Sequence, residues 1–415
     1  FFGIIIMEWI RFVLIPFLYS LSNGTGDFDY LNPTSESLKY AINLMIFELI
    51  ITYGFFYFLT TIFTKRKLTN FSIQNTRLKG SKFIYWIYII FSFAVLLFIG
   101  IPQKIVRFLY IDIGNVQERI GDNDGTLQVL VQYIITSGSF ILFILVTWIM
   151  YKRFNKHPNA IYYYVSLFVA LFNVSIIVGE RRTAQIYIAI VTIYILIQLF
   201  PKYKGKTIFY VLSLASLIII FMSIYKFFGA FMTGSYIEAV SSSNKDIGFW
   251  SKTFQSYFFG PENVAASLEF GGANNLSLRQ FLFDFFRSVF GINFFLDKNH
   301  LITSQIFNLQ IYNGLQLTGH VISAVGYGVI YFGAIFSPVI ACFNILVSFT
   351  LEILTKKTNS LELKFLFGYL LIRFCTNLYV NSPALIGFSS IILGTTGLVM
   401  LLAITLKKFG RKEFG

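Results

Sequence analysis

The chain has 415 residues, of which 56% are hydrophobic and 13% are charged, and its formal net charge is +14 at pH 7. This composition excludes an ordinary soluble globular protein, in which about 25% of the residues are charged. Apolar runs of about 20 residues recur along the chain, and an α-helix of that length crosses a bilayer. The sequence therefore predicts an all-α, polytopic transmembrane helical bundle.

The apolar runs predict membrane spans, in chain order, at about 1–21, 38–63, 83–101, 128–150, 160–178, 183–200, 207–229, 318–350, 361–380 and 385–406. The first span contains Glu8 and Arg11, which either pair at i, i+3 or extend their charged ends to the membrane surface. The span at 318–350 exceeds what a bilayer requires, so we expect it to be strongly tilted or broken near Ser337-Pro338. We expect one integral membrane domain over 1–415. Because no Met begins the chain, we expect the natural N-terminus, with a further helix, to precede Phe1.

The loops between these spans differ in charge. Lys and Arg concentrate at about 65–82, 152–156, 202–206, 356–357 and 407–412. The positive-inside rule assigns these segments, and the C-terminus, to the cytoplasm, so the net charge needs no nucleic-acid partner to explain it. The external loops are then at about 22–37, 102–127, 179–182, 230–317 and 381–384. Only 230–317 is long. Leu278, Phe281, Leu282 and Phe285 recur there in helical register, so we expect a partly helical loop that roofs the active site.

Two neighbouring arginines stand in the external segment "VGERRTAQIYIAI" at 178–190. Arg181 and Arg182 lie against the positive-inside bias, at the N-terminus of a predicted helix whose dipole adds positive potential. One interpretation is structural, with a Glu180–Arg182 ion pair or an anchor to lipid headgroups. The other is a clamp for an anionic group, because the guanidinium fork matches phosphate oxygens and keeps its proton.

Further basic side chains lie on the same predicted side. Arg279 and Arg287 occupy an amphipathic stretch of the long loop, where Asp284 neutralises part of their charge. Arg373 lies inside a predicted span, where an ionisable residue indicates function unless it snorkels to the surface. Lys104, Arg107 and Arg119 are candidate lipid or substrate contacts, with ordinary surface charge as the alternative. No acidic residues have the spacing of a metal site, so the pattern predicts a phosphate or diphosphate held by arginine, without a metal ion.

Four short segments carry a family resemblance: "GERRTAQIYIAI" at 179–190, "GPENVAASLEF" at 260–270, "DFFRSVFGINFFLDKNH" at 284–300 and "ISAVGYGVIYFG" at 322–333. In this order, with one long external loop between the helices, they resemble the Wzy-type oligosaccharide repeat-unit polymerases. The family's Gly-x-Arg aligns with either Arg181 or Arg182. Its external Pro-x-Glu-Asn patch matches loosely, because Glu262 follows Pro261 directly.

The resemblance implies an inverting glycosyltransferase with a GT-C-like helical core in the bacterial inner, or plasma, membrane. Its donor would be a glycan on undecaprenyl diphosphate, and its acceptor a repeat unit on a second such lipid. Membrane lipids, a chain-length regulator and a flippase would be its partners, and no cofactor is implied.

A glycosyl transfer of this kind also benefits from a general base near the acceptor hydroxyl. We expect His320 to be that base, since its ordinary pKa lies near the working pH. Glu262 is the next candidate, and Glu180 the third, although we expect Glu180 to orient the arginines. Helix capping or packing is the alternative role for His320.

Two other functions are the alternatives. An O-antigen ligase would use the same donor but transfer the whole glycan to a lipid A core sugar. A flippase for lipid-linked oligosaccharides is expected to show internal repeats and charges in several spans, whereas this chain has one asymmetric external loop and few charges within its predicted spans.

Overall fold

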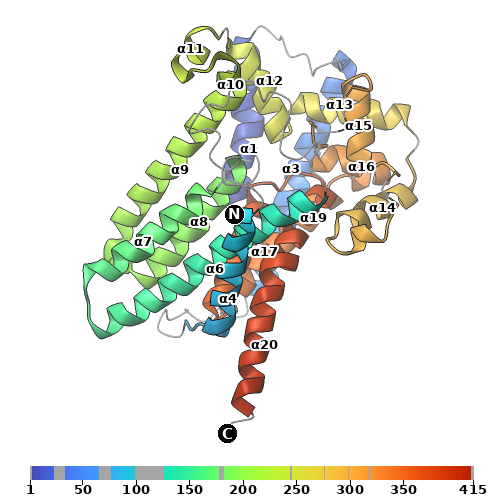
Figure 1. The fold of residues 1–415 in the computed structure, drawn as a ribbon. Coiled ribbons are helices and arrows are strands. Elements are labelled where there is room, and N and C mark those ends of the chain that lie inside the picture. The colour runs from blue at the N-terminus through green and yellow to red at the C-terminus, as the bar shows by residue number, and fades with distance from the viewer. Residues whose placement is uncertain are drawn as a thin grey trace. The chain divides into compact units, whose positions relative to one another are not determined.

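The computed structural model describes residues 2–22, 33–64, 76–98, 126–176, 182–243, 245–274, 276–297, 299–315, 317 and 319–412. Over these residues the regular structure is helical, and no β-strand is formed (Figure 1). Within this part of the chain, six helices are long and apolar enough to cross a membrane: Gly3–Leu21, Ser35–Phe63, Leu130–Lys156, Pro201–Tyr225, Val339–Lys357 and Ser382–Phe409. The all-α class is thus confirmed, whereas the GT-C-like arrangement stays a prediction.

The chain divides into two compact units. Unit 1 comprises Phe1–Asn70, Asn244–Thr350 and Arg373–Ile391. Its elements are α1 (Phe2–Trp9), η1 (Ile10–Leu14), α2 (Ile15–Leu21), α3 (Ser35–Thr64), α12 (Ile247–Phe258), α13 (Pro261–Ala273), α14 (Leu278–Ser288), η4 (Ile292–Phe294), α15 (Thr303–Ile311) and α16 (Ala324–Phe336). Most of α17 (Val339–Lys357) and α19 (Ser382–Ile392) and the end of α18 (Leu361–Cys375) also belong to it.

Unit 2 comprises Phe71–Ser243, Leu351–Ile372 and Ile392–Gly415. Its elements are α4 (Lys82–Phe98), α6 (Thr126–Lys156), α7 (Ala160–Ser175), α8 (Arg182–Leu199), η3 (Pro201–Tyr203), α9 (Lys204–Phe227), α10 (Ala230–Thr233), α11 (Tyr236–Ser241), η5 (Leu393–Gly397) and α20 (Leu398–Lys412), with most of α18. Aromatic rings fill its interior, where Phe140 packs on both Phe365 and Tyr369 of α18. A buried carboxylate, Glu362, accepts hydrogen bonds from the Gly80 amide at 2.8 Å and the Tyr85 hydroxyl at 3.2 Å.

Several predicted spans correspond, within the described residues, to helices too short to count as membrane-crossing. The apolar helices Lys82–Leu97, Ala160–Ser175, Thr183–Leu199 and Ala324–Phe336 have fewer than 18 residues. The expected span at 361–380 stops at Cys375, so α18 has 15 residues. At 1.5 Å per residue such a helix is roughly 22 Å long, less than the ~30 Å hydrocarbon core. The chain after Cys375 instead forms a short non-helical connection to α19, whose backbone groups find partners described below.

The expected break in the span at 318–350 is confirmed. Helix α16 ends at Phe336 and α17 starts at Val339, with Ser337 and Pro338 in the turn between them. Inside the last turn of α16, Gly333 adopts φ 74° and ψ 174°, which a residue without Cβ tolerates at little cost. Proline favours a break here because it has no amide to donate to the preceding turn. Residues 320–322, also included in the predicted span, are not helical.

The predicted long loop at 230–317 contains α10 to α15, so the expected helical content is confirmed. Its position outside the membrane stays a prediction. Helix α14 is amphipathic, but its buried face carries polar side chains and its exposed face carries apolar ones. The polar side chains of Gln280 and Asp284 are buried, whereas Leu278 and Leu282 are exposed. The expected helical register is correct, but the inward face carries polar groups as well as Phe281, which packs on Tyr331.

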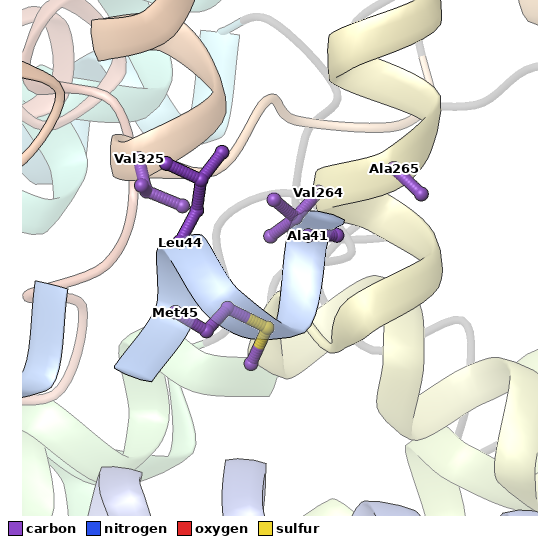
Figure 2. Packing of buried hydrophobic residues seen from close by; sticks show 6 residues of the cluster. All are labelled: Ala41, Leu44, Met45, Val264, Ala265 and Val325. Carbon is purple, nitrogen blue, oxygen red and sulfur yellow. The ribbon is translucent and has the colours of Figure 1, made fainter. Parts of the chain in front are cut away.

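A small apolar core joins three helices of unit 1. Figure 2 shows Ala41, Leu44 and Met45 of α3 beside Val264 and Ala265 of α13 and Val325 of α16. The small alanine side chains let α3 and α13 approach closely. This core fixes the first turn of α13, which carries Glu262, relative to the start of α16.

Candidate functional site

A fully buried arginine lies inside the first long apolar helix of unit 1. Arg11 has no exposed area, and its Nη1 donates to Glu48 Oε2 of α3 at 3.0 Å. The same nitrogen is 3.8 Å from Glu8 Oε1, one turn earlier in the chain. The predicted i, i+3 pair is therefore present, but the closer partner is Glu48. The snorkelling alternative is wrong, because the side chain turns into the protein to reach that carboxylate.

Two backbone features accommodate this arginine. Arg11 belongs to η1, a single π-helical turn of the kind that often marks functional sites. Its Nε donates at 3.3 Å to the carbonyl oxygen of Phe259, which ends α12 in the left-handed conformation with φ 56°. A bulky residue rarely adopts that conformation unless its surroundings stabilise it. The guanidinium also lies 4.0 Å from the centre of the Tyr379 ring. Helices α1, α3 and α12 and the α18–α19 connection thus meet at one side chain.

Glu48 was not singled out by the sequence analysis. The signal that points to it is its place as the lone acid within the apolar run at 38–63. In the structure Glu48 is fully buried, and Glu8 is 6% exposed. We call Glu8, Arg11, Glu48 and Tyr379 the Arg11 cluster.

The two preferred candidates for a general base belong to neighbouring segments of unit 1. Glu262 is the second residue of α13 and is 2% exposed, and its amide donates to Gln255 Oε1 at 3.3 Å. The next residue, Asn263, donates from Nδ2 to the Val321 carbonyl at 3.1 Å and accepts from the Ser323 amide at 3.2 Å. This asparagine therefore ties the start of α13 to the segment that follows His320.

His320 is half-buried and held from both sides of its backbone. Its amide donates to Asn308 Oδ1 at 2.7 Å, and its carbonyl accepts from Asn308 Nδ2 at 2.9 Å. The imidazole stacks on the Tyr312 ring, with 5.5 Å between centroids and 20° between planes. The backbone is fixed while the ring lies on an aromatic platform. Such a ring has the packing expected of the structural alternative.

The segment after His320 pairs with the connection that carries Tyr379. The Ala324 amide donates to the Tyr379 carbonyl at 2.7 Å, and Asn381 Nδ2 donates to the Ile322 carbonyl at 2.9 Å. Each segment then starts a helix, because Ser323 caps α16 and the Asn381 side chain accepts from the Ala384 amide at 3.0 Å. Backbone hydrogen bonds therefore link the Arg11 cluster, through Tyr379, to the His320 segment.

Three of the arginines predicted for the clamp lie in the described part of the chain. Arg279 lies exposed on α14. Arg287, also on α14, donates from Nη1 to the carbonyl oxygen of Asp297 at 2.7 Å and to that of His300. Arg373 is half-buried at the end of α18, with its guanidinium 4.6 Å from the centre of the Phe388 ring. All three belong to unit 1. Arg287 thus stabilises the loop after α14, which is a structural role beside the predicted one.

The buried Asp284 has several donors around it. Its carboxylate accepts from Tyr327 Oη at 2.7 Å, from Gln280 Nε2 at 3.0 Å and from the Thr303 amide at 3.1 Å. Burial raises the pKa of Asp284 above its ordinary value, and these donors oppose that rise. The expected role of Asp284 as a partial counter-charge stays a prediction, whereas these contacts show that it anchors α14 to α15 and α16.

Other predicted site residues lie outside the described part of the chain. These are Glu180, Arg181, Lys104, Arg107 and Arg119. Arg182 is the first residue of α8, but its side chain is not described. Among the described residues no group of three or more His, Cys, Asp or Glu side chains has an arrangement suited to a metal ion. Comparison with protein families, with curated proteins and with solved structures finds no match to this chain.

Proposed function

We propose that this chain is a membrane glycosyltransferase that joins oligosaccharide repeat units carried on undecaprenyl diphosphate. The observation that carries the proposal is that Glu262, Arg279, Arg287, His320 and Arg373 all belong to unit 1. The sequence predicted these side chains for one reaction, although they are as much as 111 positions apart in the chain (262 to 373). The resemblance to repeat-unit polymerases supports the same reaction.

The proposed chemistry needs two kinds of group. The leaving group is a diphosphate, so arginines aimed at it stabilise the negative charge that develops in the transition state. The acceptor is a sugar hydroxyl, which attacks the anomeric carbon from the opposite side and inverts its configuration. A base within hydrogen-bond reach takes the hydroxyl proton. We assign the arginines to the diphosphate and His320, with Glu262 as the next candidate, to the hydroxyl.

The direct test is mass spectrometry of the products formed by purified protein and a lipid-linked repeat unit in detergent. A polymerase lengthens the glycan by whole repeat units. A ligase leaves its length unchanged but transfers it when a lipid A core acceptor is added. No covalent change with either acceptor would contradict the proposal.

The base assignment is tested by comparing His320→Ala with Glu262→Gln in that assay. If His320 is the base, its replacement lowers turnover by about 10²–10⁴-fold, the usual contribution of general acid–base catalysis. Tyr312→Leu is the matched control, since it removes the aromatic platform and keeps the imidazole. Near-normal turnover of His320→Ala across the pH range, with an inactive Glu262→Gln variant, would make Glu262 the base.

The arginine assignment predicts a different pattern. Arg279→Ala and Arg373→Ala each remove one candidate electrostatic contact, and a group that stabilises developing charge is worth about 10²–10³-fold in turnover. Lysine rescues poorly, because it keeps the charge but loses the planar fork. Arg153→Ala, in the last turn of α6, is the control. Unchanged polymer length and yield in both variants would exclude these two side chains from the clamp.

One observation favours a second candidate, a transporter for lipid-linked oligosaccharide. Glu8, Arg11 and Glu48 are buried charges inside two helices that are long enough to cross a membrane. Buried ionisable groups in such helices often mark the path of an ion or substrate. A flippase moves a lipid-linked repeat unit across a vesicle bilayer and leaves it chemically unchanged. The detergent assay separates the two functions, since only a polymerase acts there.

A further inference from the structure

The Arg11 cluster contains more negative than positive groups. Its carboxylates are Glu8 and Glu48, and its one cation is Arg11, whose guanidinium stays protonated in proteins. The side-chain exposed fractions are 7% for Glu8 and 0% for both Arg11 and Glu48. If both carboxylates are ionised, the cluster buries one uncompensated negative charge. An uncompensated buried charge is among the most unfavourable features in a protein interior, and more so within a bilayer.

Several polar atoms of the cluster have no hydrogen-bond partner among the described residues. These atoms are both carboxylate oxygens of Glu8, Oε1 of Glu48, Nη2 of Arg11 and the hydroxyl of Tyr379. The Tyr379 hydroxyl is near the Glu8 carboxylate but forms no hydrogen bond that meets ordinary geometry. Buried polar atoms are nearly always satisfied, so a set of this size indicates a ligand or water between them. Most of these atoms are oxygens.

Several elements supply the groups that the structure describes near the two carboxylates. Glu8 comes from α1 and Arg11 from η1, and α3 supplies Glu48 together with Tyr53, which lies near Glu8. Cys342 of α17 lies near Glu48, and Tyr379 comes from the α18–α19 connection. The residue that follows helix α12, Phe259, contributes its carbonyl oxygen. Among these neighbours, Arg11 alone carries a positive charge.

The two carboxylates approach the same nitrogen of Arg11, which bounds the distance between them. Glu48 Oε2 and Glu8 Oε1 lie 3.0 and 3.8 Å from the same nitrogen of Arg11, so they are no more than 6.8 Å apart. Hard cations prefer oxygen ligands of this kind. A single positive charge neutralises the cluster, whereas a divalent ion would reverse its excess charge beside the guanidinium.

We propose that Glu8 and Glu48, with the Tyr379 hydroxyl, form a binding site for one monovalent cation, either a proton or Na⁺. The cation lies between the carboxylates, and Arg11 orients both of them. Because the cluster joins α1, α3, the end of α12 and the α18–α19 connection, the occupied site holds these elements together. The site is independent of the glycosyl transfer proposed above, and its tests use no glycan substrate.

The first experiment follows thermal unfolding of the purified full chain in detergent, in NaCl or KCl of equal ionic strength. If the cation is Na⁺, the midpoint rises in NaCl and not in KCl. Above the Kd, each tenfold increase in Na⁺ raises the ratio of folded to unfolded protein tenfold. Glu8→Gln removes this dependence, because the variant cluster is already neutral. Glu352→Gln is the control, since Glu352 forms an exposed pair with Lys356 and its replacement leaves the Na⁺ effect unchanged.

The second experiment detects the proton by infrared spectroscopy of the same protein at neutral pH. If the cation is a proton, the wild type shows a carboxylic acid band that shifts in D₂O, and Na⁺ has no specific effect. The band disappears in Glu8→Gln or in Glu48→Gln, and it persists in Glu352→Gln. Absence of both the Na⁺ effect and the acid band in the wild type overturns the proposal. Either signal, if retained in both Glu8→Gln and Glu48→Gln, also overturns it. If these variants do not fold, Tyr379→Phe decides: it weakens whichever signal is present, and a signal of wild-type strength in this variant overturns the proposal.

Discussion

Replacing Arg11 with Met tests whether the buried charge pair organises unit 1. Methionine has a comparable unbranched side chain, so it fills most of the space while it removes the charge and the donors. The substitution leaves Glu48 fully buried without the hydrogen bond at 3.0 Å that it receives from Arg11. It also removes the donor to the Phe259 carbonyl and the contact with the Tyr379 ring.

The expected loss follows from the burial of the pair. Removing one partner of a buried ion pair typically costs about 3–5 kcal/mol, because the remaining charge stays uncompensated. At 1.36 kcal/mol per power of ten, this corresponds to a fall of roughly two to almost four powers of ten in the ratio of folded to unfolded protein. An exposed pair behaves differently. Lys356→Met breaks the contact with Glu352 on α17 and is expected to cost only about 0.3–0.5 kcal/mol.

The assay is unfolding of purified protein by SDS in mixed micelles, followed by circular dichroism. The double variant Arg11→Met with Glu48→Gln returns the cluster to its wild-type net charge, so we expect it to recover much of the stability that Arg11→Met loses. The coupling between the two positions then measures the pair. The reasoning is refuted if Arg11→Met costs no more than Lys356→Met, or if the double variant is less stable than Arg11→Met alone.

Two further predictions concern α14 and α16. Because burial raises the pKa of Asp284, the folded state binds the proton of this carboxyl more tightly than the unfolded state does. The stability that this proton contributes is fully present below about pH 3.8, and it is lost as pH rises through the raised pKa. The wild type therefore loses unfolding free energy relative to Asp284→Asn as pH increases over that window. A difference in unfolding free energy that does not change with pH would contradict this. At Gly328 an added Cβ would overlap the carbonyl oxygen of Ser337, which is backbone and cannot rotate away. Gly328→Ala is expected to destabilise by about 1–3 kcal/mol or more, whereas Gly272→Ala, with open space on α13, is neutral or slightly stabilising. Equal midpoints for the two alanine variants would show that the contact is not restrictive.

The sequence by itself determined the helical class and most helix positions. Long apolar runs indicate helices because a backbone in an apolar medium must satisfy its hydrogen bonds within the segment. The break before Val339 was predictable for a local reason as well, since Pro338 cannot donate an amide to the preceding turn. The residue types proposed for the site were also chosen locally, from charges that are unusual in an apolar chain. Arg373 was identified in that way, whereas Glu262 came from the family resemblance and His320 from the ordinary pKa of histidine. The roles of all three stay predictions.

Only the tertiary structure decided which of these groups meet. Arg11 is paired with Glu48, 37 residues away, more closely than with Glu8, because the tertiary fold brings η1 next to Glu48 of α3, whereas helical periodicity relates Arg11 only to Glu8. The link between the Glu262 and His320 segments depends on one asparagine side chain that reaches across 58 residues of sequence to the Val321 carbonyl. Hydrophobic patterning is local and non-directional, so it indicates which segments are buried but not which polar groups become neighbours. Those neighbours are selected when the helices pack, since each buried charge must then find a partner inside the protein.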